Sequence, residues 1–216
     1  MTRRASTTRK KLVLFLFLSG SMVLVSLLAV LLPSSIIDLA FKEGGLVEAA
    51  SAAALGLGAL ILLGDLLRDG RSDQWHLALL TAALALRELD MDKALTEHGI
   101  LSARLYSGSA PVEQKILGAL ILTTLVWTAL RLLRRDLRPW VAALKRDESR
   151  AWLLGAAFGL YGAAKALDGA GRKLAPWGIE LSDATSRFAA RAEEGMEMLA
   201  ALLVFLACLS WRRLRA

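Results

Sequence analysis

The sequence has few of the residues that build metal and redox sites, with one cysteine and two histidines among 216 residues. A single cysteine excludes an internal disulfide framework, a CxxC redox centre and a cysteine-ligated zinc cluster. Polar residues are also scarce, because hydrophobic residues make up 56% of the chain and the mean hydropathy is +0.49. Soluble domains contain roughly 45–50% apolar residues. The composition therefore excludes an ordinary soluble globule and predicts a membrane protein.

Charged residues still account for 22% of the chain, so apolar stretches must alternate with charged connections. A helix needs roughly 20 mostly apolar residues to cross a hydrocarbon core about 30 Å thick. Within lipid every backbone amide must be satisfied inside its own segment, which favours helices. We therefore predict an all-α, polytopic membrane protein with six transmembrane helices and short interfacial helices. The predicted spans are residues 12–32, 46–67, 75–89, 112–133, 151–167 and 192–211.

The distribution of charge predicts the orientation, because positive residues in short connections stay on the cytoplasmic side. With the N-terminus inside, most of the 27 Lys and Arg residues and a minority of the 20 Asp and Glu residues fall on the cytoplasmic side. Both termini are then cytoplasmic. Residues 1–11 form a basic N-terminus, residues 12–211 the membrane domain and residues 212–216 a basic tail. The first span lacks a small-residue cleavage site and is predicted to be retained.

The basic composition, with an isoelectric point near 10.0, follows from this topology. Lys and Arg lie beside the ends of spans instead of forming a stripe interleaved with aromatic residues, so we expect membrane lipids as partners and no nucleic acid. The sequence identifies no protein partner. The basic segment 131–150 contains Trp140 and apolar residues, and it is predicted to lie as a helix on the inner surface.

Polar residues of several spans cluster at one depth, near the predicted outer surface. Glu197 lies 14 residues before Trp211 at the inner boundary, which is roughly 21 Å along a helix axis. Ionisable groups at such a depth cost about 2.5–3.5 kcal/mol each, so they should face the bundle interior and one another. We therefore expect an outward-opening, carboxylate-rich pocket where four helices converge. Its polar residues are Glu48, Arg87, Glu88, Asp90, Lys165, Asp168, Arg187, Arg191, Glu193, Glu194 and Glu197.

The spacing within the last span assigns roles to this pocket. Residues three and four apart share a helix face, so Glu197 can act together with Glu193 or Glu194. Three carboxylates so close cannot all be ionised in a low dielectric without cations. A hard divalent metal, Mg²⁺, Ca²⁺ or Mn²⁺, would be bound by these three glutamates. The candidate catalytic residues are Glu193, Glu197, Glu88 and Asp90, and the candidate substrate-binding residues are Arg87, Glu48, Lys165 and Arg191.

The pattern leaves several functions open. One is a metal-dependent or acid/base hydrolase or transferase, or a receptor, for a lipid-proximal ligand. Another is a proton- or ion-coupled transporter, since intramembrane carboxylates also serve as proton relays. A third is a structural or assembly subunit, in which salt bridges hold four helices together without chemistry. No internal repeat supports the transporter, and the inner half of the spans is apolar, which favours a one-sided site.

Outside the pocket, the sequence predicts mainly packing and boundary roles. The small residues from Ala49 to Gly58 and the pair Gly155-x-x-x-Gly159 favour close helix packing. Residues 94–106 are compatible with one interfacial helix that covers the pocket. His98 in this segment is interpreted as a solvated residue, and His76 as a residue at the inner membrane boundary.

The middle third of the chain carries a family resemblance. The segment from Arg87 to Lys93 reads Arg-Glu-Leu-Asp-Met-Asp-Lys, and Gly99-Ile-Leu, Arg104-Leu-Tyr and Glu113-x-Lys follow it. This pattern resembles a group of uncharacterised bacterial inner-membrane proteins with an Arg-Glu-Leu/Met-Asp core. The resemblance implies a bacterial inner-membrane location and no particular activity.

Overall fold

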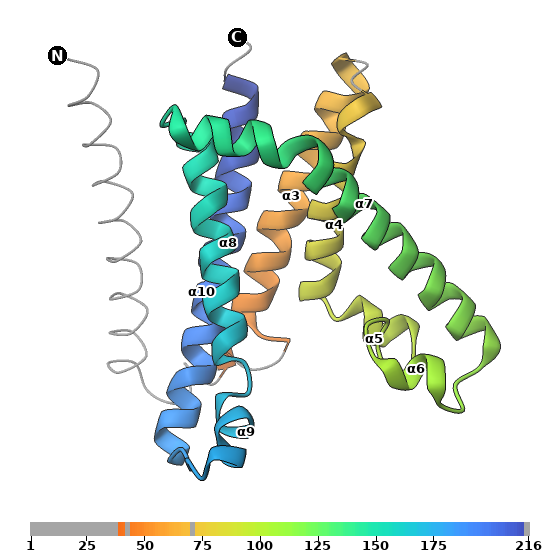
Figure 1. Ribbon diagram of the computed structural model, residues 1–216, viewed down its shortest axis with the longest axis vertical. Helices are drawn as coiled ribbons and strands as arrows, with labels where there is room; N and C mark the ends of the chain where they lie inside the picture. The colour runs from red at the N-terminus through yellow and green to blue at the C-terminus, as the bar shows by residue number, and fades with distance from the viewer. Residues whose placement is uncertain (1–38, 42–43, 70–71, 214–216) are drawn as a thin grey trace, which may run out of the picture.

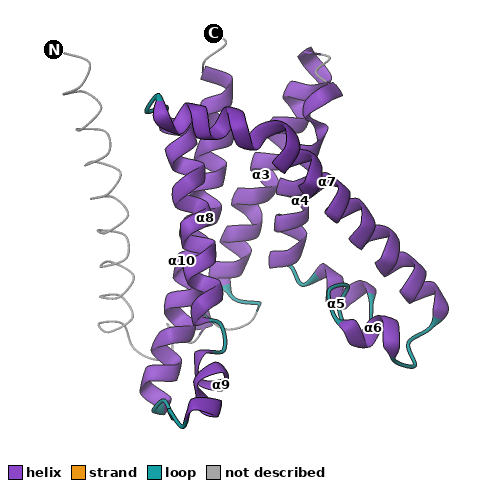
Figure 2. Ribbon diagram, viewed as in Figure 1, coloured by secondary structure: helices purple, strands orange, loops and turns teal. Residues whose placement is uncertain are grey.

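The computed structural model describes residues 39–41, 44–69 and 72–213. All regular elements in these residues are helices, as Figure 2 shows. Their order along the chain is α3 (Leu46–Asp69), η1 (Ser72–Gln74), α4 (Trp75–Glu88), α5 (Met91–Leu95), α6 (Ala103–Ser107), α7 (Val112–Lys145), α8 (Ser149–Leu167), α9 (Ala170–Leu174), η2 (Ala175–Trp177) and α10 (Asp183–Arg213). The expected all-α class is confirmed for this part of the chain.

Helices α3, α4, α8 and α10 pack into a bundle, and successive long helices run in opposite directions (Figure 1). Its core is built mainly from alanine and leucine, with Leu55 of α3, Ala157 of α8 and Leu203 of α10 almost fully buried. Small side chains let these helices approach closely. A Cβ atom added to Gly58 of α3 would lie 3.4 Å from Cys208 Sγ of α10. Gly58 therefore packs against another helix, as the small-residue stretch predicts.

Helix α7 is one continuous helix of 34 residues that joins the fourth predicted span to the predicted surface helix. Figure 1 shows that it bends and then crosses one end of the bundle over α8. Pro139 lies within the helix, and its missing N–H removes the bond to the Arg135 carbonyl. The second half is anchored on α8, where Trp140 Nε1 donates to the Ala151 carbonyl at 3.0 Å.

Two helices, over Leu46–Arg68 and Val112–Lys145, are long and apolar enough to cross a membrane. In the apolar window of α7 only 11% of residues are buried, so it is not the core helix of this bundle. Its Ile116, Leu120 and Val126 are 56%, 63% and 49% exposed. Large exposed apolar surfaces of this kind mark contact with lipid or protein. These two helices favour membrane association.

Among the described residues, the predicted spans at 75–89, 151–167 and 192–211 do not meet the same measure of length and hydropathy, so six transmembrane helices are not confirmed. The span at 12–32 and the terminal segments 1–11 and 214–216 lie outside the described residues. Helix α4 has only 14 residues, and α10 begins nine residues before its predicted span and continues to Arg213. The interfacial segment 94–106 is not one helix. It is divided between α5 and α6, with Gly99 at φ +76° in the connection.

Candidate polar binding site

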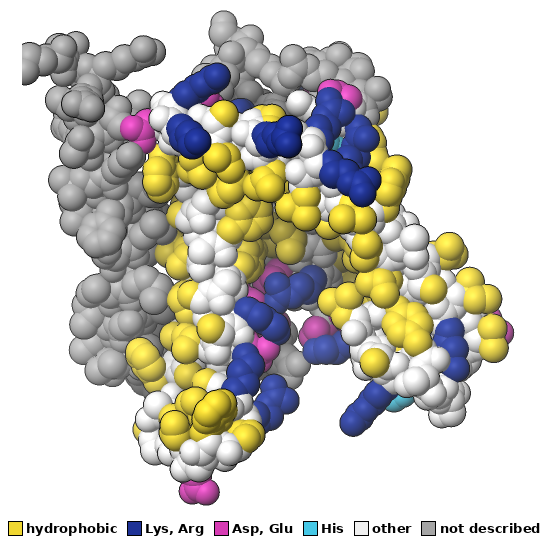
Figure 3. Space-filling model, in the orientation of Figure 1, with side chains coloured by type: hydrophobic (Ala, Val, Ile, Leu, Met, Phe, Trp, Pro, Cys, Tyr) yellow, Lys and Arg dark blue, Asp and Glu magenta, His cyan; other side chains and the backbone are white. Residues whose placement is uncertain are grey.

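Charged side chains gather at the end of the bundle opposite the second half of α7. Figure 3 shows Lys, Arg, Asp and Glu side chains around a hollow between the bundle and the α5–α7 region. Each helix of the bundle supplies part of this polar cluster, because α3 and α10 begin there and α4 and α8 end there (Figure 1). The cluster is defined here by Glu48 of α3, Arg87 and Glu88 of α4, Tyr161 of α8, and Glu193, Glu194 and Glu197 of α10.

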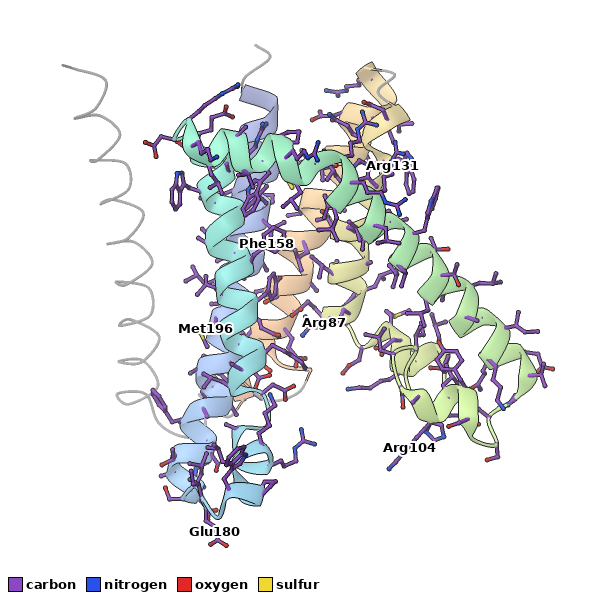
Figure 4. All side chains as sticks on the ribbon, viewed as in Figure 1. Arg87, Arg104, Arg131, Phe158, Glu180 and Met196 are labelled. Carbon is purple, nitrogen blue, oxygen red and sulfur yellow. The ribbon has the colours of Figure 1, made fainter. Side chains whose placement is uncertain are left out.

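Arg87 and Glu197 form the direct ionic contact between α4 and α10. Arg87 Nη2 donates to Glu197 Oε1 at 2.7 Å. The Glu197 side chain is 11% exposed, whereas the Arg87 side chain is 47% exposed and lies at the end of α4 (Figure 4). A charge-assisted hydrogen bond of this length is among the stronger polar contacts in proteins. It joins two helices that are 110 residues apart in the sequence.

Glu88 is the most deeply buried acid of the cluster, with its side chain only 3% exposed. Arg87 Nη1 lies 3.8 Å from Glu88 Oε1, beyond hydrogen-bond distance. Within the described residues Glu88 Oε1 has no hydrogen-bond partner, and neither has the buried hydroxyl of Tyr161. These two groups interact electrostatically with each other and with Arg87 and Glu197. Buried polar atoms are nearly always hydrogen-bonded, so this pair marks a place for a polar ligand or water.

Glu194 and Glu48 extend the negative charge of the cluster. Glu194 is partly buried, and its carboxyl group interacts electrostatically with four other acids of the cluster, Glu48, Glu88, Glu193 and Glu197. Glu48 is partly satisfied locally, because its Oε2 accepts a hydrogen bond from Gly44 N at 2.6 Å. The acidic side chains of the cluster thus outnumber its one arginine, Arg87. Such an arrangement attracts protons or a cationic group.

A second set of charges, the basic rim, lies beside the cluster and consists of Lys165, Arg172 and Lys173 on α8 and α9. All three side chains are exposed. Lys165 Nζ donates to Asp168 Oδ2, and this hydrogen bond lowers the pKa of the Asp168 carboxyl below its ordinary value. Lys173 Nζ donates to the Lys165 carbonyl at 2.8 Å. Glu193 interacts with both lysines, so the rim and the acidic cluster are continuous.

The structure brings together most of the residues expected at the site. Arg87 contacts both Glu88 and Glu197, and Glu48, Glu193 and Glu194 are close enough to interact electrostatically with these acids.

The other candidate residues lie at the edge of the site. Asp90 has a left-handed backbone with φ 49° and forms an ion pair with Lys93 at 2.8 Å. Lys165 belongs to the rim, and Arg191 is partly buried three residues before Glu194.

The residues expected to bind a divalent metal do not form a metal site. In the part of the chain that the structure describes, no three His, Cys, Asp or Glu side chains are arranged to share one metal ion. Glu197 is directed to Arg87, and Glu193 interacts with the rim lysines. The assignment of Glu193, Glu194 and Glu197 as metal ligands therefore stays a prediction that the arrangement of the described side chains does not support.

Two polar features were missed at the sequence level. Tyr161 lies within the predicted span 151–167 and is not among the expected site residues, although its position four residues before Lys165 places both on one face of α8. His76 was interpreted as a boundary residue, but it is 0% exposed and its Nε2 lies 2.7 Å from Asp136 Oδ2. Arg131 Nε donates to His76 Nδ1 at 3.4 Å. This network joins α4 to α7 near its bend. Arg131 and Asp136 lie 55 and 60 residues after His76, so no local sequence pattern predicts these contacts.

The fold and the cluster together define an all-helical protein with two helices apolar enough to cross a membrane and a buried polar site at one end of its bundle. Comparison with family models, curated proteins and solved structures gives no match for this chain.

Proposed function

We propose that this chain is a bacterial inner-membrane protein that binds a lipid-proximal ligand with a cationic group in its outward-facing polar site. In this proposal six helices cross the membrane and both termini are cytoplasmic. This proposal is supported by the exposed apolar surface of α7 and by the antiparallel order of the long helices. It is also supported by the basic residues at the end of the bundle away from the polar cluster.

The observation that carries the proposal is the pair of unsatisfied buried groups, Glu88 Oε1 and the Tyr161 hydroxyl. Leaving a buried acceptor unpaired costs about 1–3 kcal/mol, and more for a charged group. A ligand that donates hydrogen bonds to Glu88 would recover this free energy. Because Glu194 and Glu48 add negative charge nearby, a cationic donor fits better than a neutral or anionic one.

Native mass spectrometry of the full chain tests this proposal. The protein is purified in mild detergent, equilibrated with polar lipids of a bacterial inner membrane, and analysed for retained molecules. We expect one retained ligand per chain, lost in a Glu88→Gln/Glu194→Gln variant and kept in Glu113→Gln, an exposed acid at the start of α7. Helix content and elution volume check that each variant is folded. Equal retention by all three proteins, or no retention, would refute the proposal.

A second candidate is acid/base hydrolysis or group transfer at the same site. The half-exposed Arg87 beside the buried Glu88 favours it, since a guanidinium can hold an anionic substrate group next to a carboxylate base. Incubation with lipid vesicles followed by product analysis tests it. We expect wild type to release a headgroup, with the rate lowered about 100-fold or more in Glu88→Gln, within the range of general-base catalysis. Unchanged lipid composition with wild type excludes this candidate.

A further inference from the structure

The charges of the site are ordered from the inside outward. The inner part contains the buried Glu88, the partly buried Glu194 and the buried Tyr161 hydroxyl, and the exposed part is the basic rim of Lys165, Arg172 and Lys173. Figure 3 shows Lys and Arg side chains beside acidic ones along the hollow. A simple cation or a polyamine would be repelled by the rim, and an anion by the interior. The order matches a ligand with a leading positive and a trailing negative group.

The hollow also has an apolar side. The first half of α7 contacts α6, where Leu105 and Tyr106 lie against Gly118. The contacts of α7 with α4 and α8 lie further along the helix, at Trp127 and Trp140. The first half of α7 therefore stands away from α8, and Figure 3 shows hydrophobic side chains along that side of the hollow. An acyl chain can lie against this surface while a headgroup reaches the acidic interior.

The chemistry of the buried acceptors selects the kind of cation. Glu88 Oε1 lacks a hydrogen-bond partner among the described residues, and an ammonium group offers three N–H donors. A quaternary ammonium offers none and is bound by cages of several aromatic rings. The Tyr161 hydroxyl, which also lacks a partner among the described residues, can accept a further N–H of a primary ammonium, whereas a quaternary ammonium can donate to neither group. A primary ammonium therefore fits the interior better than a choline group.

We propose that the site binds a headgroup with a primary ammonium and a phosphodiester, as in phosphatidylethanolamine. The ammonium donates to Glu88 and Glu194, and the phosphate pairs with Lys165 and Lys173 of the basic rim. This inference rests on the proposed function and specifies its ligand class. The same chemistry exists in a membrane lipid and in the soluble glycerophosphoethanolamine, and the test includes both.

The experiment is a competition monitored by native mass spectrometry on the full chain. Equal amounts of phosphatidylethanolamine, phosphatidylcholine and phosphatidylglycerol with the same acyl chains are offered together. We expect phosphatidylethanolamine to be retained about tenfold over either competitor, the ratio expected from one or two charge-assisted hydrogen bonds. Glu88→Gln should reduce this preference to about twofold or less, while Glu113→Gln should keep it.

A Lys165→Glu/Lys173→Glu variant tests the phosphate contact without altering the buried acids. It should weaken retention of phosphatidylethanolamine, and an Arg138→Glu control at the other end of the bundle should not. Displacement of the lipid by soluble glycerophosphoethanolamine would identify the free headgroup as a sufficient ligand and also support the inference. Retention of phosphatidylcholine or phosphatidylglycerol at the same level would overturn the inference but leave the proposed function standing. Retention of no lipid and no soluble headgroup would overturn both.

Discussion

At the level of single residues, the contact between Arg87 and Glu197 determines how the polar cluster is held. Glu197 is buried and Arg87 is half exposed, so the pair joins a desolvated carboxylate to a partly hydrated guanidinium. Removing one partner of a fully buried pair costs about 3–5 kcal/mol, because a charge is left uncompensated. The exposure of Arg87 reduces this cost, since water and salt screen the guanidinium.

We predict that Arg87→Ala lowers the free energy of unfolding by about 1–3 kcal/mol. The double variant Arg87→Ala/Glu197→Ala should lose less than the sum of the two single variants, because no charge remains unpaired. Denaturant unfolding in detergent measures the three values, and Arg104→Ala, an exposed arginine of α6, is the control. Strict additivity would mean that the two side chains do not interact.

The identity of the residues in the cluster was largely predictable, and their partners were not. Glu88, Glu197 and Arg87 stand out because each is ionisable at the end of an apolar stretch. Their different surroundings depend on the rotation of α4 and α10 about their axes, which local sequence does not encode. The same reason applies to His76, whose partners Asp136 and Arg131 come from another helix.

At the level of elements, helix α7 combines a membrane-length apolar helix with a bent, basic segment over the end of the bundle. The bend is held by Trp140, which donates to the Ala151 carbonyl and lies 3.4 Å from the position of a Cβ atom on Gly155. Gly159, one turn further along α8, has nothing within 4 Å of such an atom. These two glycines therefore provide a matched comparison.

We predict that Gly155→Leu destabilises the protein by about 1–3 kcal/mol, because the larger side chain displaces Trp140. Gly159→Leu should be neutral or stabilising, since leucine favours a helix over glycine by up to about 1 kcal/mol. Thermal unfolding of both variants in the same detergent measures the difference. Equal melting temperatures would show that the second half of α7 is not packed on α8 at Gly155.

The existence of helices was predictable, but their lengths and connections were not. Hydropathy separates residues 112–133 from the basic segment that follows, although the backbone continues through both as α7. A helix can pass from an apolar to an amphipathic environment without losing hydrogen bonds, so a change in composition need not end it. In contrast, α5 and α6 interrupt a stretch whose apolar spacing is compatible with one helix.

At the level of the whole molecule, the two ends of the bundle differ in charge. One end carries the basic segment of α7, and the other carries the polar cluster, α9 and the start of α10 (Figure 1). In the proposed topology, the positive-inside rule places the basic segment in the cytoplasm and the polar cluster on the outer side. This orientation decides from which side a ligand reaches the site.

We predict that the two ends of the bundle lie on opposite sides of the membrane. Single cysteines test this prediction in a Cys208→Ala background, because Cys208 is the only cysteine in the sequence. Glu180→Cys, in the exposed connection before α10 (Figure 4), should react with a membrane-impermeant maleimide on intact spheroplasts. Lys145→Cys, at the end of α7, should react only after the membrane is opened. The reverse pattern would invert the topology, and labelling of both sites on intact spheroplasts would contradict a membrane-spanning bundle.

The sequence by itself determined that the described chain is helical and apolar, and which ionisable residues stand out against that background. Hydropathy and charge near the ends of apolar stretches are local properties, so they can be read without coordinates. Only the tertiary structure decided that Glu197 pairs with Arg87, that Glu88 and Tyr161 have buried atoms without hydrogen-bond partners among the described residues, and that no three acidic side chains of these residues are grouped around one metal position. These outcomes depend on how helices far apart in the chain pack and turn toward one another.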